Sequence, residues 1–237
     1  MMVRSFLNID ENYKLINERI AEAAQKVGKR REDITLLGAT KTVEVGAVNH
    51  AIMLGLDHIG ENRVQELLLK YGDYNLESCS LQFIGHLQTN KVKSIVGKVD
   101  LIQSVDSVKL AKEISDQSVK KGISTDILVE VNIGREENKS GVMEENLDEL
   151  LCEIAGFEGI SVKGLMTVPP ICDNELNISK YFNKMHKLFI DISAKKLDNV
   201  SMTILSMGMS SDYYEAILHG ANMVRIGSAL FGARNYT

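Results

Sequence analysis

A lysine near one end of the chain and an arginine near the other belong to short apolar segments typical of β-strands. Lys41 ends the segment at residues 34–41, and Arg225 lies in a second segment that finishes in Gly227 and Ser228. A lysine at the end of a strand is held in a site instead of being spread over a solvated helix face. Partial desolvation or a neighbouring cation can remove its proton, and the neutral amine then attacks carbonyl groups. Lys41 is therefore a candidate nucleophile toward an aldehyde.

Two small-residue loops could bind the phosphate of such a substrate. Gly227 and Ser228 are typical of a tight turn, whose backbone N–H groups and hydroxyl can cradle a phosphate. A hydroxyl-rich loop further upstream opens a helix, and its Ser206, Met209 and Ser210 are predicted to line the same phosphate. An amine nucleophile beside a phosphate site indicates a phosphorylated aldehyde. Pyridoxal 5′-phosphate (PLP) is the first candidate.

Each of these residues also has an ordinary structural role open to it. Lys41 could be a solvated loop lysine, and Arg225 could pair with a carboxylate at a surface rim. The Gly-Ser pair could be a turn and nothing more. Ser211 or Asp212 could cap the helix after the serine loop without any ligand.

Other polar residues have stronger structural alternatives. Asn62 followed by Gln65 fits a capping box at a helix start, although a capping residue can also contact a ligand. His86 is expected to be a neutral structural histidine, Lys139 a loop lysine with at most a secondary role, and Met166 part of a pocket wall. The five histidines show no metal-ligand spacing, so no metal site is predicted.

The elements that must position these residues alternate along the chain. Residues 8–28 repeat apolar side chains at helical spacing and predict an N-terminal helix. Eight strand-like segments follow, at residues 34–41, 57–61, 81–87, 101–105, 126–133, 160–168, 202–207 and 223–227. Helical patterns lie between them, at residues 44–54, 63–71, 88–96, 107–120, 144–155, 177–194 and 212–218.

Eight alternations within 237 residues favour an α/β fold with a closed (β/α)8 TIM barrel over an open doubly wound sheet. No linker or low-complexity tract interrupts the chain, so we expect one domain over residues 1–237. Sites in such barrels lie at the carboxyl ends of the strands, and phosphates often bind after the seventh and eighth strands. Six residues are thereby expected to meet at one rim: Lys41, Asn62, His86, Met166, Ser206 and Arg225.

Composition argues against several classes of protein. A net charge of -5 argues against nucleic acid as the default partner, because a basic surface is expected for that role. Three cysteines without C-x-x-C spacing argue against a disulfide framework and a zinc site. No apolar stretch approaches the roughly 18 residues that span a bilayer, and the N-terminus lacks a signal-peptide core. We expect a cytoplasmic protein that binds neither nucleic acid nor membranes.

Six segments occur in an order that resembles a known family. They are residues 38–42 (G-A-T-K-T), 58–66, 83–91, 164–167, 205–210 (L-S-M-G-M-S) and 224–234. Together they span nearly the whole chain and are similar to the pyridoxal phosphate homeostasis proteins. The resemblance implies a barrel like the N-terminal domain of bacterial alanine racemase, with PLP as its cofactor.

The resemblance also implies a role for each matching residue. Lys41 would carry PLP as an internal aldimine, which is a Schiff base. Asn62 would lie near the ring hydroxyl, and Arg225 would face the pyridine nitrogen. The phosphate would be held by Ser206, Met209, Ser210, Gly227 and Ser228. Ser228 stands where many relatives have threonine, and either residue supplies a hydroxyl.

The same resemblance favours a carrier over an enzyme. An arginine beside the pyridine nitrogen disfavours its protonation, and an unprotonated ring is a weak electron sink. Racemases use such an arginine too, but they add a second acid/base from a C-terminal domain, and this chain ends just past the eighth predicted strand. The expected function is to hold PLP and supply it to PLP-dependent apo-enzymes without turnover. A small PLP-dependent racemase is the alternative, and a cofactor-free Schiff-base aldolase is a third possibility.

Overall fold

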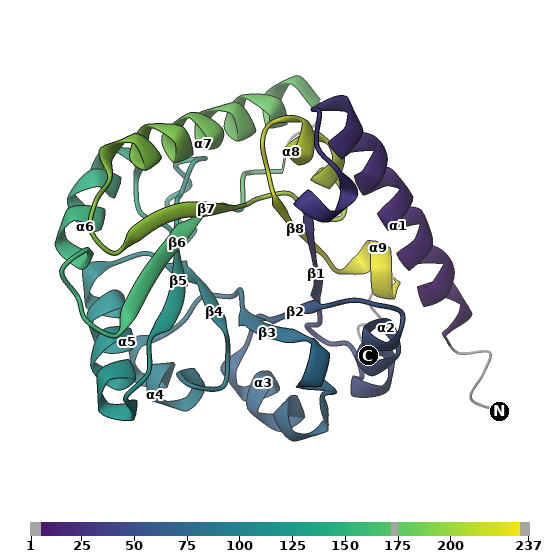
Figure 1. The fold of residues 1–237 in the computed structure, drawn as a ribbon, viewed down its shortest axis with the longest axis horizontal. Coiled ribbons are helices and arrows are strands. Elements are labelled where there is room, and N and C mark those ends of the chain that lie inside the picture. Colours follow the sequence, from purple (N-terminus) through teal and green to yellow (C-terminus); the bar gives the residue numbers. More distant parts are fainter. Residues whose placement is uncertain (1–5, 172–174, 233–237) are drawn as a thin grey trace.

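A computed structural model describes residues 6–171 and 175–232 of the chain. Its eight strands are all parallel and close into a barrel in sequence order, so the predicted (β/α)8 fold is confirmed (Figure 1). The strands are β1 (Thr35–Ala39), β2 (His58–Glu61), β3 (Ser80–Phe83), β4 (Leu101–Val105), β5 (Thr125–Glu130), β6 (Ile160–Met166), β7 (Val200–Ser206) and β8 (Met223–Ile226). Closure comes from β1, which pairs with both β2 and β8.

Helices form a ring around the barrel (Figure 1). They are α1 (Leu7–Lys26), α2 (Val45–Met53), α3 (Val64–Lys70), α4 (Val92–Ile95), α5 (Val108–Lys121), α6 (Leu147–Ile154), α7 (Glu175–Lys195), α8 (Tyr213–Leu218) and α9 (Ser228–Phe231). The amphipathic helix predicted at the N-terminus is α1, and it packs on the outside against α8 and α9. None of the described helices is long and apolar enough to cross a membrane.

The barrel separates two hydrophobic clusters. Strand side chains that point outward pack under the helices and form the main core. The inward-pointing side chains Leu37, Leu101, Leu128, Met166 and Met223 form a small cluster with Ile84, which follows β3. This double burial explains why the strands are nearly continuous apolar runs. Eight polar residues are also buried in the strands: Glu61, Gln82, Gln103, Ser104, Thr125, Glu130, Ser206 and Arg225.

Several strands end earlier than predicted. β1 ends at Ala39, so Lys41 lies in the turn two residues beyond the strand. β3 ends at Phe83 and β5 at Glu130, and the apolar residues directly after them lie outside the strands. The short helix α9 was not predicted, because four residues cannot display a helical period.

Candidate functional site

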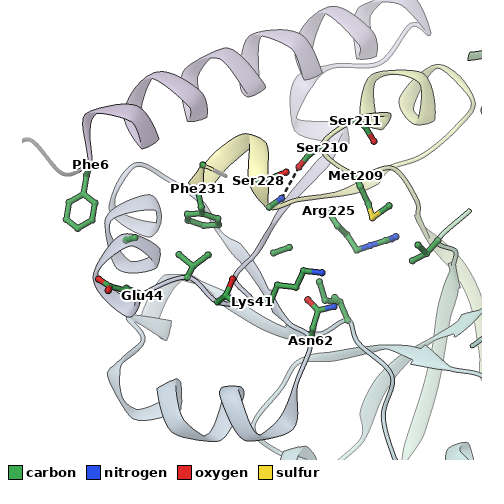
Figure 2. A pocket seen from close by; sticks show the side chains of 18 residues that line it. Phe6, Lys41, Glu44, Asn62, Met209, Ser210, Ser211, Arg225, Ser228 and Phe231 are labelled. Carbon is green, nitrogen blue, oxygen red and sulfur yellow. Dashed lines mark hydrogen bonds between the residues drawn. The ribbon is translucent and has the colours of Figure 1, made fainter. Parts of the chain in front are cut away.

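A cavity of about 890 Å3 opens at the carboxyl ends of the strands (Figure 2). Loops after β1, β2, β3, β6, β7 and β8 contribute to its wall, together with α9 and the residue before α1. The lining residues are Phe6, Ala39, Lys41, Thr42, Val43, Glu44, Ala47, Asn62, Ile84, Val168, Met209, Ser210, Ser211, Arg225, Gly227, Ser228, Phe231 and Gly232. The cavity lies at the end of the barrel where (β/α)8 proteins carry their active sites.

The fold brings most of the predicted site residues to this cavity. Seven of the nine line it: Lys41, Asn62, Met209, Ser210, Arg225, Gly227 and Ser228. Arg225 belongs to β8, and the others follow β1, β2, β7 or β8, at sequence positions as far apart as 41 and 228. Figure 2 shows Lys41, Asn62 and Arg225 directed into the same space.

Met166 and Ser206 are not in the wall. Met166 is 1% exposed and packs inside the barrel with Leu128 and Leu37. Ser206, the last residue of β7, is fully buried, and its hydroxyl donates to Gln103 Oε1 at 2.7 Å. Because β7 turns the side chain of Ser206 inward, the structure does not place its hydroxyl among the cavity residues as the sequence suggested.

Arg225 is the buried cation of the site. It is 5% exposed, its Nη1 donates to Ser206 Oγ at 2.6 Å, and its Nη2 donates to the Thr167 carbonyl at 2.8 Å. Burial lowers the pKa of Arg225 to about 10, against the opposing influence of Glu130 and Asp212. The guanidinium therefore stays charged at neutral pH, and its two donated bonds fix its plane.

A chain of hydrogen bonds continues from Arg225 through the barrel interior. Arg225 donates to Ser206, Ser206 donates to Gln103, and Gln103 Nε2 donates to Gln82 Oε1 at 2.6 Å. Gln82 Nε2 then lies 3.1 Å from His58 Nδ1, beside a second cavity of about 280 Å3 at the opposite end of the barrel. Each side chain in this series of hydrogen bonds has a partner, and linked bonds of this kind hold a buried group rigidly. In the sequence, polar residues within strand-like apolar segments are the signal for such a hydrogen-bonded series.

The loops after β7 and β8 are joined by Ser210. Its Oγ accepts hydrogen bonds from the backbone nitrogens of Gly227 at 3.3 Å and Ala229 at 3.2 Å. Asp212 occupies the N-cap position of α8, but its Oδ1 accepts from the backbone of Met209 at 2.6 Å and makes no cap bond into the helix. The result is a cavity edge built from small residues, with serine hydroxyls and nearby backbone N–H groups.

Asn62 contributes an unpaired acceptor. Its Oδ1 is buried and has no hydrogen-bond partner among the described residues. The predicted capping box is wrong, because α3 starts one residue later, with Arg63 at the N-cap position and no side-chain cap bond. The side chain of Asn62 is thereby left to the cavity, where its Oδ1 can accept a bond from a ligand.

His86 and Lys139 lie in loops outside the cavity wall. His86 Nδ1 is 3.0 Å from Ser140 Oγ, and Lys139 forms an ion pair with Glu136. Within the described residues, no group of three or more His, Cys, Asp or Glu side chains is arranged to hold a metal ion.

Glu130, the last residue of β5, is a buried carboxyl that the sequence did not single out. Burial raises the pKa of Glu130 to about 7, the negative charge of Asp106 adds to the increase, and Arg225 opposes it. The folded chain therefore holds this proton more tightly than the unfolded chain does. Glu130 contributes most to stability below pH 4.5, and that contribution is lost as the pH rises through 7.

A Glu130→Gln variant should accordingly be more stable than the wild type at pH 8 but not at pH 4. The expected gain in the free energy of unfolding between these pH values is about 3 kcal/mol. Urea unfolding at both pH values measures it, with Glu149→Gln on exposed surface as the control. An equal effect of Glu130→Gln at the two pH values would contradict the raised pKa.

Comparisons with known proteins identify the family of the chain. Residues 9–235 match the family model described as the N-terminal domain of alanine racemase. The chain is 43% identical to the pyridoxal phosphate homeostasis protein of Aquifex aeolicus (strain VF5), across 97% of this chain and 100% of that protein. It is 28% identical to PipY of Synechococcus elongatus PCC7942, solved with PLP bound, at a TM-score of 0.80 over 92% of this chain and 100% of that one.

A more distant structure shares the fold. Alanine racemase of Clostridium difficile 630 superposes with a TM-score of 0.70 at 21% identity, across 96% of this chain and 57% of that one. The identity to the Aquifex protein over nearly the full length of both chains is decisive. The chain belongs to the alanine racemase N-terminal domain family and, within it, to the pyridoxal phosphate homeostasis proteins.

Proposed function

We propose that this chain is a single-domain cytoplasmic PLP carrier, which holds the cofactor on Lys41 and supplies it to PLP-dependent apo-enzymes. The observation that carries the proposal is the convergence of Lys41, Asn62, Arg225 and the serine-rich edge on one cavity of about 890 Å3. That volume is in the range of small-molecule sites. The PLP-bound structure of PipY, at 28% identity, supports the choice of ligand.

The chemical groups in the wall fit PLP. The serine-rich edge offers hydroxyl and backbone N–H groups to a phosphate, since Ser210, Ser211 and Ser228 all line it. The unpaired Oδ1 of Asn62 can accept a hydrogen bond from a ring hydroxyl. Arg225, fixed by Ser206 and Thr167, presents a positive charge from the barrel interior, and that charge would favour an uncharged ring nitrogen.

Lys41 supplies the covalent link in this proposal. Its Nζ would hold the aldehyde carbon as a Schiff base, with the aldehyde oxygen released as water. When bound, PLP supplies an electron-withdrawing ring, and the cation of Arg225 would keep the ring nitrogen unprotonated and weaken that capacity. This weakened electron-withdrawing capacity favours a carrier over a racemase.

Reduction and peptide mapping test the covalent link. The protein is loaded with PLP, reduced with borohydride and digested with trypsin. Trypsin does not cleave after a modified lysine, so the label is expected on the peptide of residues 32–63, which spans Lys41. Label on any other peptide, or no label, would refute the assignment.

A transfer assay tests the carrier role. Loaded protein is mixed with a PLP-dependent apo-enzyme, with and without a scavenger of free PLP, and the recovered enzyme activity is followed. Activation that survives the scavenger is expected from direct delivery, whereas activation that the scavenger abolishes indicates release into solution. No activation in either arm would refute the carrier role. Exchange of the α-proton of alanine or serine with solvent at a useful rate would favour the racemase instead.

A further inference from the structure

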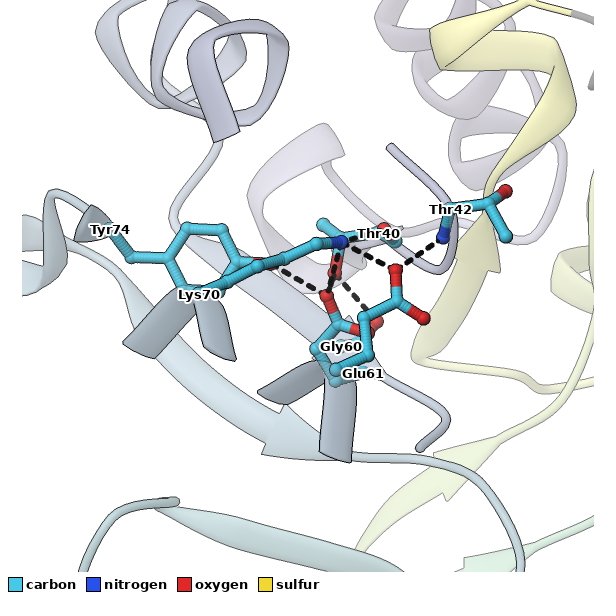
Figure 3. Close-up of polar contacts among 7 residues, drawn as sticks. Thr40, Thr42, Gly60, Glu61, Lys70 and Tyr74 are labelled. Atoms are coloured by element: carbon cyan, nitrogen blue, oxygen red, sulfur yellow. Dashed lines mark hydrogen bonds and ion pairs between the residues drawn. The ribbon is translucent and has the colours of Figure 1, made fainter. Parts of the chain in front are cut away.

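One polar cluster surrounds the backbone on both sides of Lys41 (Figure 3). It consists of Thr40, Thr42, Glu61, Glu66, Lys70 and Tyr74, which we call the support cluster. Its charged side chains are shielded from water: Glu61 is 0% exposed, Lys70 12% and Glu66 17%. Ion pairs this deep cost desolvation energy and are weak devices for stability alone. Their place beside the proposed nucleophile suggests a functional role.

The residue before Lys41 is held from two directions. Thr40 is fully buried, and its Oγ1 donates to Glu61 Oε1 at 2.8 Å. The Thr40 carbonyl accepts from Lys70 Nζ at 3.1 Å, while its backbone nitrogen donates to the Gly60 carbonyl at 2.9 Å. With its backbone groups and its hydroxyl all bonded, Thr40 cannot shift without breaking several hydrogen bonds.

The residue after Lys41 is held in an unusual conformation. Thr42 has φ 61°, in the left-handed region that β-branched residues rarely adopt. Its backbone nitrogen donates to Glu66 Oε1 at 2.6 Å. Strained residues of this kind persist where their surroundings over-determine them, and they cluster at functional sites. The Glu66 carboxylate is the partner that holds Thr42 in this conformation.

Lys70 joins the two halves of the cluster. Its Nζ donates to Glu61 Oε1 at 3.1 Å and to Glu66 Oε1 at 2.6 Å, in addition to the Thr40 carbonyl. Tyr74 OH donates to Glu61 Oε1 at 2.6 Å, and burial raises the pKa of Tyr74, so this hydroxyl remains a donor. The two carboxylates therefore share one ammonium, and the residues on either side of Lys41 are anchored to a single network.

We propose that the support cluster positions Lys41, with Glu66 holding the left-handed turn at Thr42 that directs the lysine side chain into the cavity. Glu66 acts through the backbone, so it is a positioning residue that does not touch the ligand. The inference rests on the proposed function for the identity of the aldehyde. The anchoring of the turn itself is a property of the chain without ligand.

Three variants separate positioning from simple stabilisation: Glu66→Ala, Thr42→Gly and the double variant. Glu66→Ala removes the acceptor that holds Thr42, so the turn should relax and the affinity for PLP should fall roughly tenfold. Glycine adopts the left-handed conformation without a steric penalty. Because Thr42 itself lines the cavity, the rescue is judged against Thr42→Gly alone. Adding Glu66→Ala to Thr42→Gly should weaken affinity much less than the roughly tenfold loss that it causes in the wild type. Glycine at a positive φ also relieves strain in the folded chain, so urea unfolding of all three variants is measured alongside. A stabilising role alone predicts that affinity follows the free energy of unfolding.

Two readouts make the test independent of PLP. The first is the rate at which Lys41 of the ligand-free protein is reductively methylated by formaldehyde, relative to Lys139, measured by peptide mapping. The second is hydrogen exchange of the Thr42 amide. Glu66→Ala should change the Lys41 rate several-fold and speed exchange at Thr42, and Thr42→Gly should restore the Lys41 rate. If wild-type protein fails to bind PLP at Lys41, the proposed function is refuted. The methylation rate of Lys41 and the amide exchange of Thr42 still test whether the support cluster positions Lys41.

Matched controls keep the test sharp. Asp116→Ala removes an exposed ion pair of the same i,i+4 spacing and length, with Lys112 at 2.6 Å on α5, and should change neither readout. Glu66→Gln keeps an oxygen that can accept from Thr42, so its affinity should fall between wild type and Glu66→Ala, even if the alanine variant folds poorly. Unchanged affinity and labelling in Glu66→Ala, or no rescue by Thr42→Gly, would overturn the proposal.

Discussion

A Lys41→Ala variant is expected to lose all covalent attachment of PLP while keeping a melting temperature close to that of the wild type. Among the described residues of the cavity wall, no other side chain carries a primary amine that could replace the attacking nitrogen. Lys41 lies in a turn beyond β1 and is half-buried, and truncation at such a position typically changes stability by less than about 0.5 kcal/mol. Visible absorbance, borohydride labelling and thermal unfolding measure the three quantities.

Lys139→Ala is the control for this variant. Lys139 belongs to a loop at the same end of the barrel but pairs with Glu136 and does not line the cavity. Its replacement should leave the visible absorbance and the labelled peptide unchanged. A Lys41→Ala protein that is labelled to the wild-type extent would mean that another lysine holds the cofactor.

A Gly85→Ala variant is expected to lose both stability and affinity for PLP. A Cβ at position 85 would lie 2.1 Å from the Asn62 carbonyl oxygen and 2.7 Å from its Cα, so the backbone of Asn62 would have to move. Overpacking of this kind typically costs about 1–3 kcal/mol. Because Asn62 lines the cavity with an unpaired Oδ1, the same displacement should weaken PLP binding. Urea unfolding and absorbance titration measure the two effects.

Gly72→Ala is the matched control, since a Cβ at position 72 meets no atom within 4 Å. It should leave both the free energy of unfolding and the PLP affinity close to wild type. If Gly85→Ala is as stable as Gly72→Ala and binds PLP equally well, the close packing of the two loops does not constrain Asn62.

Asn62 shows where inference from local sequence patterns fails. Asn62 with Gln65 has the spacing of a capping box, yet α3 begins after Asn62 and has no side-chain cap bond. The loop after β3 packs directly against the Asn62 backbone at Gly85, 23 residues away in sequence. The spacing of neighbouring residues carries no information about this contact. In the folded chain Asn62 lines the cavity instead of capping a helix.

The order of amino acids specifies the barrel and most of the site, because both follow from short-range patterns. Apolar runs that alternate with helical spacing define eight strands, and the rule that sites lie at strand ends brings Lys41, Arg225 and Ser210 to one rim. The fold adds everything that depends on contacts across the barrel. Ser206 turns inward to Arg225 and Gln103, and Thr42 adopts its left-handed turn against Glu66. Such contacts join residues from different strands and helices, so their partners are defined only once the barrel has closed.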